Sequence, residues 1–104
     1  MKTQEFEKAI ADFKRAVEIR PDYREAYDNL GWLFARNRDW DDAILYLTKS
    51  IELDPKRGWA YHNRGRSYFK NGNLEKALND AKKACELGYN EGCKAYETYK
   101  KAAP

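Results

Sequence analysis

The 104-residue sequence predicts an all-α fold, built as an array of antiparallel helix pairs. Three observations support this prediction. One phrase recurs every 34 residues, as EFEKAIADFKRAVEIRPDY, DWDDAILYLTKSIELDPKR and NLEKALNDAKKACELGYNE. A second phrase lies between its copies, as REAYDNLGWLFARNR and then GWAYHNRGRSYFKNG. Within both phrases apolar residues recur three or four positions apart, which is the spacing of an amphipathic helix, and a period of this length is typical of stacked helical units.

We expect six helices joined by short turns, and no strand, over residues 3–19, 22–36, 39–53, 56–70, 73–87 and 90–101. The first helix is expected because Phe6, Ile10 and Phe13 lie on one face of it, with charged residues between them. The second is expected to begin at Asp22, which precedes Glu25 by three residues, as in a capping box.

The remaining helices follow from similar signals. Asp39 opens the third helix, and Asp41 and Asp42 then lie in its first turn, where the helix dipole favours carboxylates. This helix ends before Pro55, because the residue before a proline disfavours the helical conformation. The fourth helix repeats the pattern of the second, Asn73 opens the fifth, and the sixth follows a turn bounded by glycine.

Composition allows one modest domain and argues against several classes of partner. The formal net charge is +3 and the pI is about 8.8, with no block of about five or six like charges, so nothing calls for nucleic acid or a membrane surface. No apolar run approaches ~18 residues, and the N-terminus lacks a signal-peptide pattern. We expect no nucleic acid partner and no membrane contact by this segment, and its localisation stays open.

Several positions recur in phase along the chain. The first complete copy reads Tyr27-x2-Leu30-Gly31-x2-Phe34, followed by Ala43-x3-Leu47 and Pro55. This pattern resembles the tetratricopeptide repeat (TPR), a 34-residue helix–turn–helix unit with the signature W-x2-L-G-x2-Y, A-x3-F and P. The next copy departs from the signature, with Arg64 where leucine is usual and Tyr89 in place of the proline.

The resemblance implies a right-handed α-solenoid that forms a single domain over residues 1–104. Residues 1–23 hold only the second helix of a truncated repeat, 24–57 and 58–91 are full repeats, and 92–104 form a C-terminal capping helix. The terminal helix then acts as the solvated cap that such arrays need.

The resemblance also implies that the chain binds a protein or peptide, because in this family the first helix of each pair lines a concave face. The matching positions on that face are Glu25, Asp28, Asn29, Trp32, Arg36, Trp59, His62, Asn63, Arg66, Phe69 and Lys70. Trp32 and Trp59 are the expected anchors, since tryptophan is common at interface hot spots. Arg36, Arg66 and Lys70 favour an acidic or carboxylate-bearing segment. The alternative is that the two indoles only pack between repeats.

Some members of the family grip a C-terminal carboxylate with lysine, asparagine and arginine residues. That set is not met here, because Asp28 and Trp32 stand where it needs lysine and asparagine, and only Asn63 occupies a suitable position. A generic protein or peptide scaffold is therefore the better expectation.

Catalysis has little support in the sequence. The one histidine, His62, has no cysteine or serine beside it in a triad motif. No Gly-rich phosphate loop, H-E-x-x-H or C-x2-C pattern occurs. We therefore expect no enzyme activity, no cofactor and no metal site.

Cys85 and Cys93 flank the glycine-bounded turn, and two interpretations are open. They could form a disulfide across the contact of two helices. This spacing also resembles a cysteine-rich branch of helical-repeat proteins, in which such pairs link adjacent helices. They could equally be reduced thiols at small-residue packing positions. Only the disulfide would favour an exported or periplasmic protein.

The first helix has no partner within its own repeat, and three explanations compete. The chain is a fragment or begins with an irregular cap; a partner protein supplies the missing helix; or copies of the chain associate head to tail. Self-association would involve Phe6, Ile10 and Phe13 at one end and Tyr96 and Tyr99 at the other. An interaction scaffold is the favoured function, and a self-associating structural element, hence a homo-oligomer, is the alternative.

Overall fold

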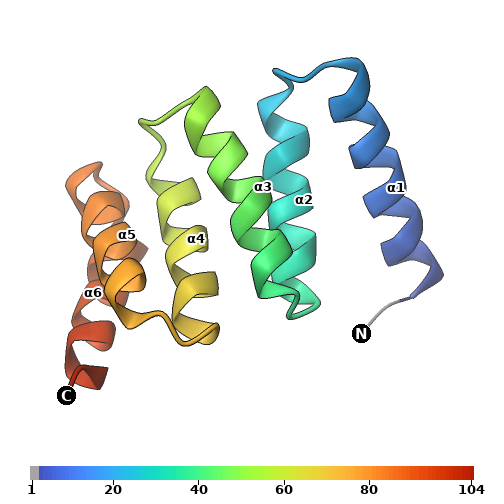
Figure 1. The fold of residues 1–104 in the computed structure, drawn as a ribbon. Helices are drawn as coiled ribbons and strands as arrows, with labels where there is room; N and C mark the ends of the chain where they lie inside the picture. The colour runs from blue at the N-terminus through green and yellow to red at the C-terminus, as the bar shows by residue number, and fades with distance from the viewer. Residues whose placement is uncertain (1–2) are drawn as a thin grey trace.

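The computed structural model describes residues 3–104, so the first two residues of the predicted unit 1–23 lie outside the described part. Six α-helices and no strand occur in this part (Figure 1): α1 (Gln4–Ile19), α2 (Arg24–Arg36), α3 (Trp40–Leu53), α4 (Gly58–Lys70), α5 (Leu74–Glu86) and α6 (Asn90–Ala102). The predicted helices are confirmed, with every boundary within two residues of its expected place.

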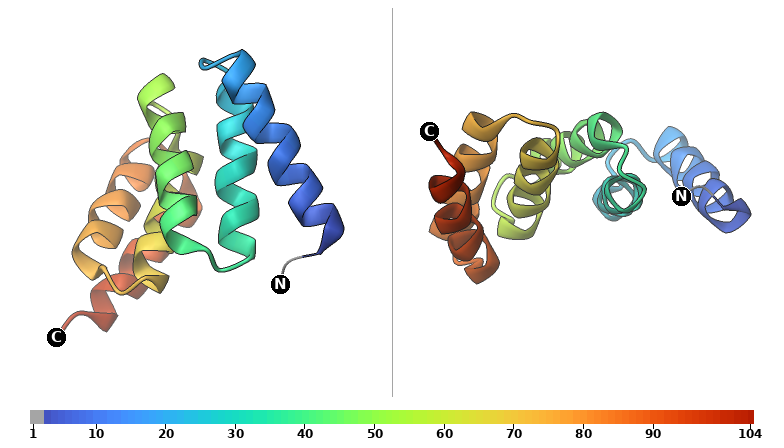
Figure 2. Two further views of the ribbon diagram at one scale, coloured as in Figure 1. Left: turned by 45° about the vertical axis from the view of Figure 1, so that its right-hand side comes forward. Right: turned by 90° about the horizontal axis from the view of Figure 1, so that it is seen from below.

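The helices follow one another along an elongated array of 41 × 29 × 18 Å, with the chain termini at opposite ends (Figure 2). Each helix packs against the next one in the chain, and α4 also contacts both α2 and α6. The helices α2, α4 and α6 therefore share one face, which we call the groove face. The described residues form an all-α helical-repeat solenoid.

The helices of each pair approach closely because small residues stand at their contacts. A Cβ atom added to Gly31 of α2 would lie 2.5 Å from Cγ of Leu47 in α3. A Cβ added to Gly92 of α6 would lie 2.5 Å from Cβ of Ala84 in α5. Atoms do not pack at such distances, so any larger residue at these two positions would push the helices apart.

Two apolar clusters lie on either side of the middle of the array. The first contains Ile10, Leu30, Phe34 and Ala43, and the second contains Ala77, Ala81 and Tyr99. Parallel stacks of aromatic rings reinforce both clusters, with centroids 5.6 Å apart for Phe34 and Tyr46 and 4.4 Å apart for Phe69 and Tyr99. The core is thus distributed along the array rather than gathered at one centre.

The expected helix starts need two corrections. Helix α2 begins at Arg24 after Tyr23 and has no side-chain cap, so Asp22 does not cap it. In the turn before it the Tyr27 hydroxyl donates to the carbonyl of Pro21 at 3.0 Å. Asp39 does precede α3, but its carboxylate accepts a hydrogen bond from Nδ2 of Asn37 at 2.7 Å rather than capping the helix.

Asn73 behaves as the sequence predicts. Its side-chain oxygen accepts a hydrogen bond from the backbone N–H of Lys76 at 3.2 Å, and so caps the first turn of α5.

A buried ion pair in the pair α4–α5 replaces an apolar contact of the pair α2–α3. Leu30 and Tyr46 belong to the first apolar cluster, and the residues 34 positions later are Arg64 and Asp80. Nε and Nη2 of Arg64 each donate to one carboxylate oxygen of Asp80, at 2.8 Å, and Asp80 is only 5% exposed. Burial disfavours the charged guanidinium, but the hydrogen bonds and charge of Asp80 outweigh it, so the pKa of Arg64 is raised above its ordinary value.

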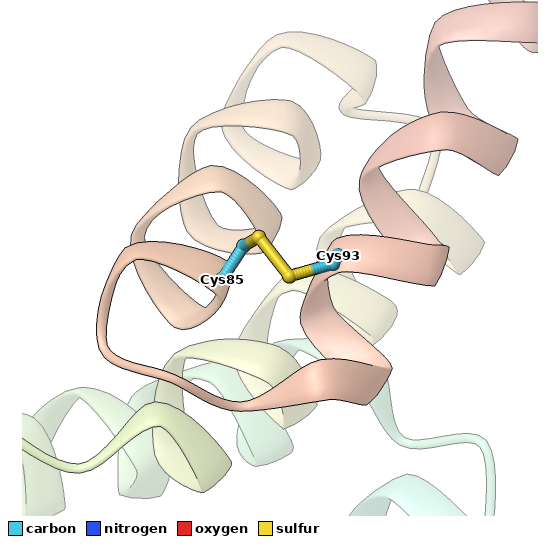
Figure 3. Close-up of a disulfide and its surroundings, with 2 residues drawn as sticks. All are labelled: Cys85 and Cys93. Carbon is cyan, nitrogen blue, oxygen red and sulfur yellow. A yellow bond between two sulfur atoms is a disulfide. The ribbon is translucent and has the colours of Figure 1, made fainter.

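Cys85 of α5 and Cys93 of α6 form a disulfide, with their Cα atoms 4.6 Å apart (Figure 3). Of the two interpretations that the sequence left open, the structure contains the bridged one. The bond lies beside the contact of Gly92 with Ala84 and links the last helix to the rest of the array.

Replacing Arg64 with leucine should destabilise the fold by about 3–5 kcal/mol, because the Asp80 carboxylate would stay buried without its partner. The double variant Arg64→Leu/Asp80→Tyr copies the residues of the preceding pair and should recover most of that loss. Urea denaturation of the parent and both variants measures the difference. Equal instability of the single and double variants would contradict this explanation.

Removing the disulfide with Cys85→Ser/Cys93→Ser should lower the free energy of unfolding by about 2–3 kcal/mol, because the bridge closes a short loop in the unfolded chain. Thermal unfolding with and without reductant checks this. The parent should lose stability on reduction and the double variant should not respond. A parent with the same melting temperature in both conditions would show that the bridge does not contribute.

Candidate binding groove

Trp32 is the centre of the groove face. Its side chain borders three cavities, and the residue is 41% exposed. The first cavity, of about 480 Å³, lies between α2 and α4 and is lined by Glu25, Asp28, Asn29, Trp32, Arg57 and Trp59. The two expected anchors, Trp32 and Trp59, therefore line the same cavity.

Both indoles are held in place by guanidinium groups of the chain itself. The Arg36 guanidinium lies 4.7 Å from the ring centroid of Trp32, and that of Arg57 lies 5.5 Å from the ring of Trp59. Such cation–π contacts limit the motion of the rings. Rings that are already ordered lose less conformational entropy when a ligand binds them.

Asp28 lines the cavity but is committed to a structural role. Its carboxylate accepts hydrogen bonds from Arg57 at 3.1 Å, from Arg24 at 3.0 Å and from the hydroxyl of Ser50. These partners come from α2, α3 and the turn before α4, so Asp28 joins three segments. We therefore do not expect Asp28 to be free to contact a ligand.

Asn29 and Asn63 are equivalent residues, 34 positions apart, and make the same contact. The Nδ2 group of Asn29 donates to the carbonyl of Glu25 at 2.8 Å, and that of Asn63 donates to the carbonyl of Trp59 at 2.9 Å. Each bond orients the amide one helical turn back, which leaves the amide oxygen as an acceptor.

The second cavity, of about 80 Å³, carries the basic end of the groove face. It is lined by Trp32, Ala35, Arg36, Trp40, Asn63, Arg66, Ser67 and Lys70. Arg36, Arg66 and Lys70 are exposed, whereas Glu25 lies at the first cavity. At the first cavity Glu25 and Asp28 lie within ion-pair distance of arginines, so the unpaired cations of the groove face gather at the second cavity.

The third cavity, of about 420 Å³, extends the groove face to α1. Its lining residues are Thr3, Glu5, Phe6, Ala9, Trp32, Leu33, Arg36 and Asn37. Phe6, which the sequence placed in a self-association face, contacts Phe34 edge-on at 6.1 Å. Sequence reasoning missed Arg57 and Trp40 as lining residues, since neither is at a first-helix position of the repeat frame.

Two expected site residues, Tyr99 and Ile10, are buried within the chain, and a third, Phe69, is half-buried. Phe69 lines no groove cavity, because its ring stacks on Tyr99. Tyr99 is only 5% exposed and Ile10 only 8%, so each offers a partner only the few atoms that line a surface cavity. Of the expected self-association residues, Phe6, Phe13 and Tyr96 remain half-buried.

A further cavity, of about 290 Å³, lies between α4 and α6. It is lined by His62, Arg66, Glu91, Lys94, Ala95, Thr98 and Tyr99. The His62 ring lies 5.2 Å from the ring of Tyr89, and its Nδ1 atom is buried without a hydrogen-bond partner among residues 3–104. Burial and the nearby Arg66 lower the pKa of His62, while the Glu91 carboxylate opposes the shift.

The described residues contain no cluster of three or more His, Cys, Asp or Glu side chains placed to hold a metal ion. Within residues 3–104, none of the helices combines the length and the apolar character needed to cross a bilayer.

Family models identify the repeats. A model described as "TPR repeat" matches residues 1–37, and two described as "Tetratricopeptide repeat" match 24–57 and 46–79, so that together they span 1–79. A search of curated proteins found no match.

Solved structures share the fold at low sequence identity. The first TPR domain of Spaghetti (RPAP3), bound to the HSP90 peptide SRMEEVD, has a TM-score of 0.88 and 21% identity over 94% of this chain and 79% of that one. The TPR2B domain of yeast Sti1, in a complex with pHsp70, has a TM-score of 0.86 and 18% identity, over 95% of this chain and 86% of that one. MamA from Desulfovibrio magneticus RS-1, from residue 41 to its end, has a TM-score of 0.77 and 16% identity, over 93% of this chain and 66% of that one.

The lowered pKa of His62 predicts how stability depends on pH. Since the ordinary value is 6.5 and burial lowers it in the folded chain, the unfolded chain binds the proton at higher pH. Neutral His62 therefore contributes fully to the free energy of unfolding above pH 6.5. The contribution decreases as the pH falls from 6.5 through the lower pKa of the folded chain. Proton NMR of the single histidine should give a midpoint below 6.5.

The matched variant is His62→Gln. Urea unfolding at about pH 7.5 and about pH 5.5 should show a smaller pH dependence for the variant than for the parent. The same dependence in both would assign it to carboxylates instead.

Proposed function

The chain belongs to the tetratricopeptide-repeat family, whose fold serves as a protein-interaction scaffold, and we propose that its groove face binds a peptide segment of a partner protein. One observation carries this proposal: Trp32, a large apolar residue at 41% exposure, borders three cavities that follow one another across α1, α2 and α4. The RPAP3 domain that shares the fold is bound to an HSP90 peptide, and the Sti1 domain is in a complex with pHsp70. Both structures support the proposal that this chain binds a peptide.

The chemistry of the cavities indicates the class of peptide. An apolar or aromatic side chain fits the first cavity, where two indoles, each in contact with a guanidinium group, form part of the wall. Acidic residues fit beside it, at the end where Arg36, Arg66 and Lys70 are exposed. Because the unpaired cations lie at one end only, one direction of the peptide is favoured.

The family match also supports a role without catalysis. Self-association through the ends of the array has less support. It would depend mainly on Phe6, Phe13 and Tyr96, since Ile10 and Tyr99 are only 8% and 5% exposed.

Selection of random displayed peptides on the immobilised chain should give sequences with an apolar residue followed by acidic ones. Trp32→Ala and Trp59→Ala should each weaken binding of a selected peptide by at least about tenfold, because each removes a wall of the first cavity. Isothermal titration calorimetry measures the affinities.

The control variant is Leu45→Ala, which removes another exposed apolar side chain, 54% exposed on α3 and outside the three cavities. It should leave the affinity unchanged. Circular dichroism melting checks that all three variants stay folded. Tryptophan variants that bind as tightly as the control would rule out the groove face.

A further inference from the structure

We propose that the cavity between α4 and α6 is a second binding subsite, which takes an acidic side chain of the bound peptide between Arg66 and Lys94, with His62 as a contact that responds to pH. This inference rests on the proposed peptide-binding function. It assigns α6 a part in binding beyond that of a terminal cap.

The cavity joins the groove face through a shared residue. Arg66 lines both this cavity and the second cavity beside Trp32, so a peptide anchored at Trp32 can continue from one to the other. Tyr99 is fixed in the cavity wall by its stack on Phe69, and Ala95 is small enough to leave room above it. The subsite is therefore an ordered extension of the groove face.

The cations of this cavity are free for a ligand. Among the described residues Arg57 and Arg64 are both engaged in ion pairs, whereas Arg66 and Lys94 are in none and are exposed. Glu91 is the one carboxylate in the lining. The local charge is thus positive, which favours an anionic group.

Comparison with the preceding helix pair shows that a carboxylate and its partners are missing at this place. The residues equivalent to Asp28, Ser50 and Arg57, 34 positions later, are His62, Ala84 and Glu91. In the earlier pair, Asp28 contacts Ser50 and Arg57 directly. In the later pair Ala84 has no group to donate, and the His62 ring packs against Tyr89 with Nδ1 unpartnered.

The charge of His62 then depends on its neighbours and on the ligand. Arg66 of α4, Tyr89 of the preceding turn, and Glu91, Lys94 and Tyr99 of α6 are the titratable groups around it, and neither α2 nor α5 contributes a lining residue. Burial and Arg66 lower its pKa, so the ring is neutral at pH 7.

A bound carboxylate would favour the charged imidazolium and raise the pKa of His62. By linkage, the same carboxylate must bind more tightly as the pH falls.

The test uses acetylated, amidated tetraglutamate as the probe and tetraglutamine as its uncharged control. Titration of the ¹⁵N-labelled chain should shift backbone amides of α4 and α6 around the cavity with tetraglutamate only. Bound tetraglutamate should also raise the pH at the midpoint of the His62 protonation curve. Arg66→Gln and Lys94→Gln should each weaken the affinity about two- to fivefold, the scale of an exposed ion pair. Glu91→Gln should strengthen it by a similar factor.

Matched controls lie on the same helix outside the cavity. Lys101→Gln and Glu97→Gln make the same changes of net charge, and both residues are exposed. They should change the affinity less than Lys94→Gln and Glu91→Gln do. Any of three results would overturn the subsite. The control variants could change the affinity as much as Lys94→Gln and Glu91→Gln do; the amide shifts could be confined to the region of Arg36 and Lys70; or the midpoint of the His62 titration could stay unchanged.

The outcome separates this inference from the proposed function. If selected peptides still depend on Trp32 while tetraglutamate leaves α6 unshifted, the subsite is wrong and peptide binding at the first cavity stands. If Trp32→Ala has no effect on selected peptides, the proposed function itself fails.

Discussion

The close approach of the helices within each pair is the constraint on which the rest of the structure depends. At Gly31 the side chain of Leu47 fills the space that a Cβ would need, and Ala84 does the same at Gly92. Successive residues lie about 100° apart around a helix, so a contact that fixes one position also fixes the direction of its neighbours. Leu30, on one side of Gly31, is buried, whereas Trp32, on the other side, is exposed on the groove face. The packing contact therefore limits the directions in which Trp32 can point.

Charged residues divide into two groups with different consequences. Asp28 with Arg57, and Arg64 with Asp80, are paired at the contacts between helices, where they replace apolar packing. Arg36, Arg66, Lys70 and Lys94 have no ion-pair partner among the described residues and are exposed around the groove face cavities. Although the net charge of the whole chain is only +3, positive charge is in local excess around these cavities, where we expect a ligand to bind.

The helices and most residues of the groove face could be predicted because the 34-residue period fixes which face each position occupies. What the period does not show is which side chains meet across the array. Phe69 occupies the same position as Ala35, so only the arrival of Tyr99 from α6 reveals that it is covered. Asp28 looked free for the same reason, since its partners Ser50 and Arg57 are distant in sequence.

The replacement of Leu30 and Tyr46 by Arg64 and Asp80 limits how the array can be recombined. A hybrid that joined α2 to α5 would set Leu30 against Asp80, and the reciprocal hybrid would set Arg64 against Tyr46. Each would leave a buried charge without a counter-charge. Duplication or shuffling of whole pairs keeps both partners together. The unit that evolution or protein engineering can move is therefore the helix pair and not the single helix.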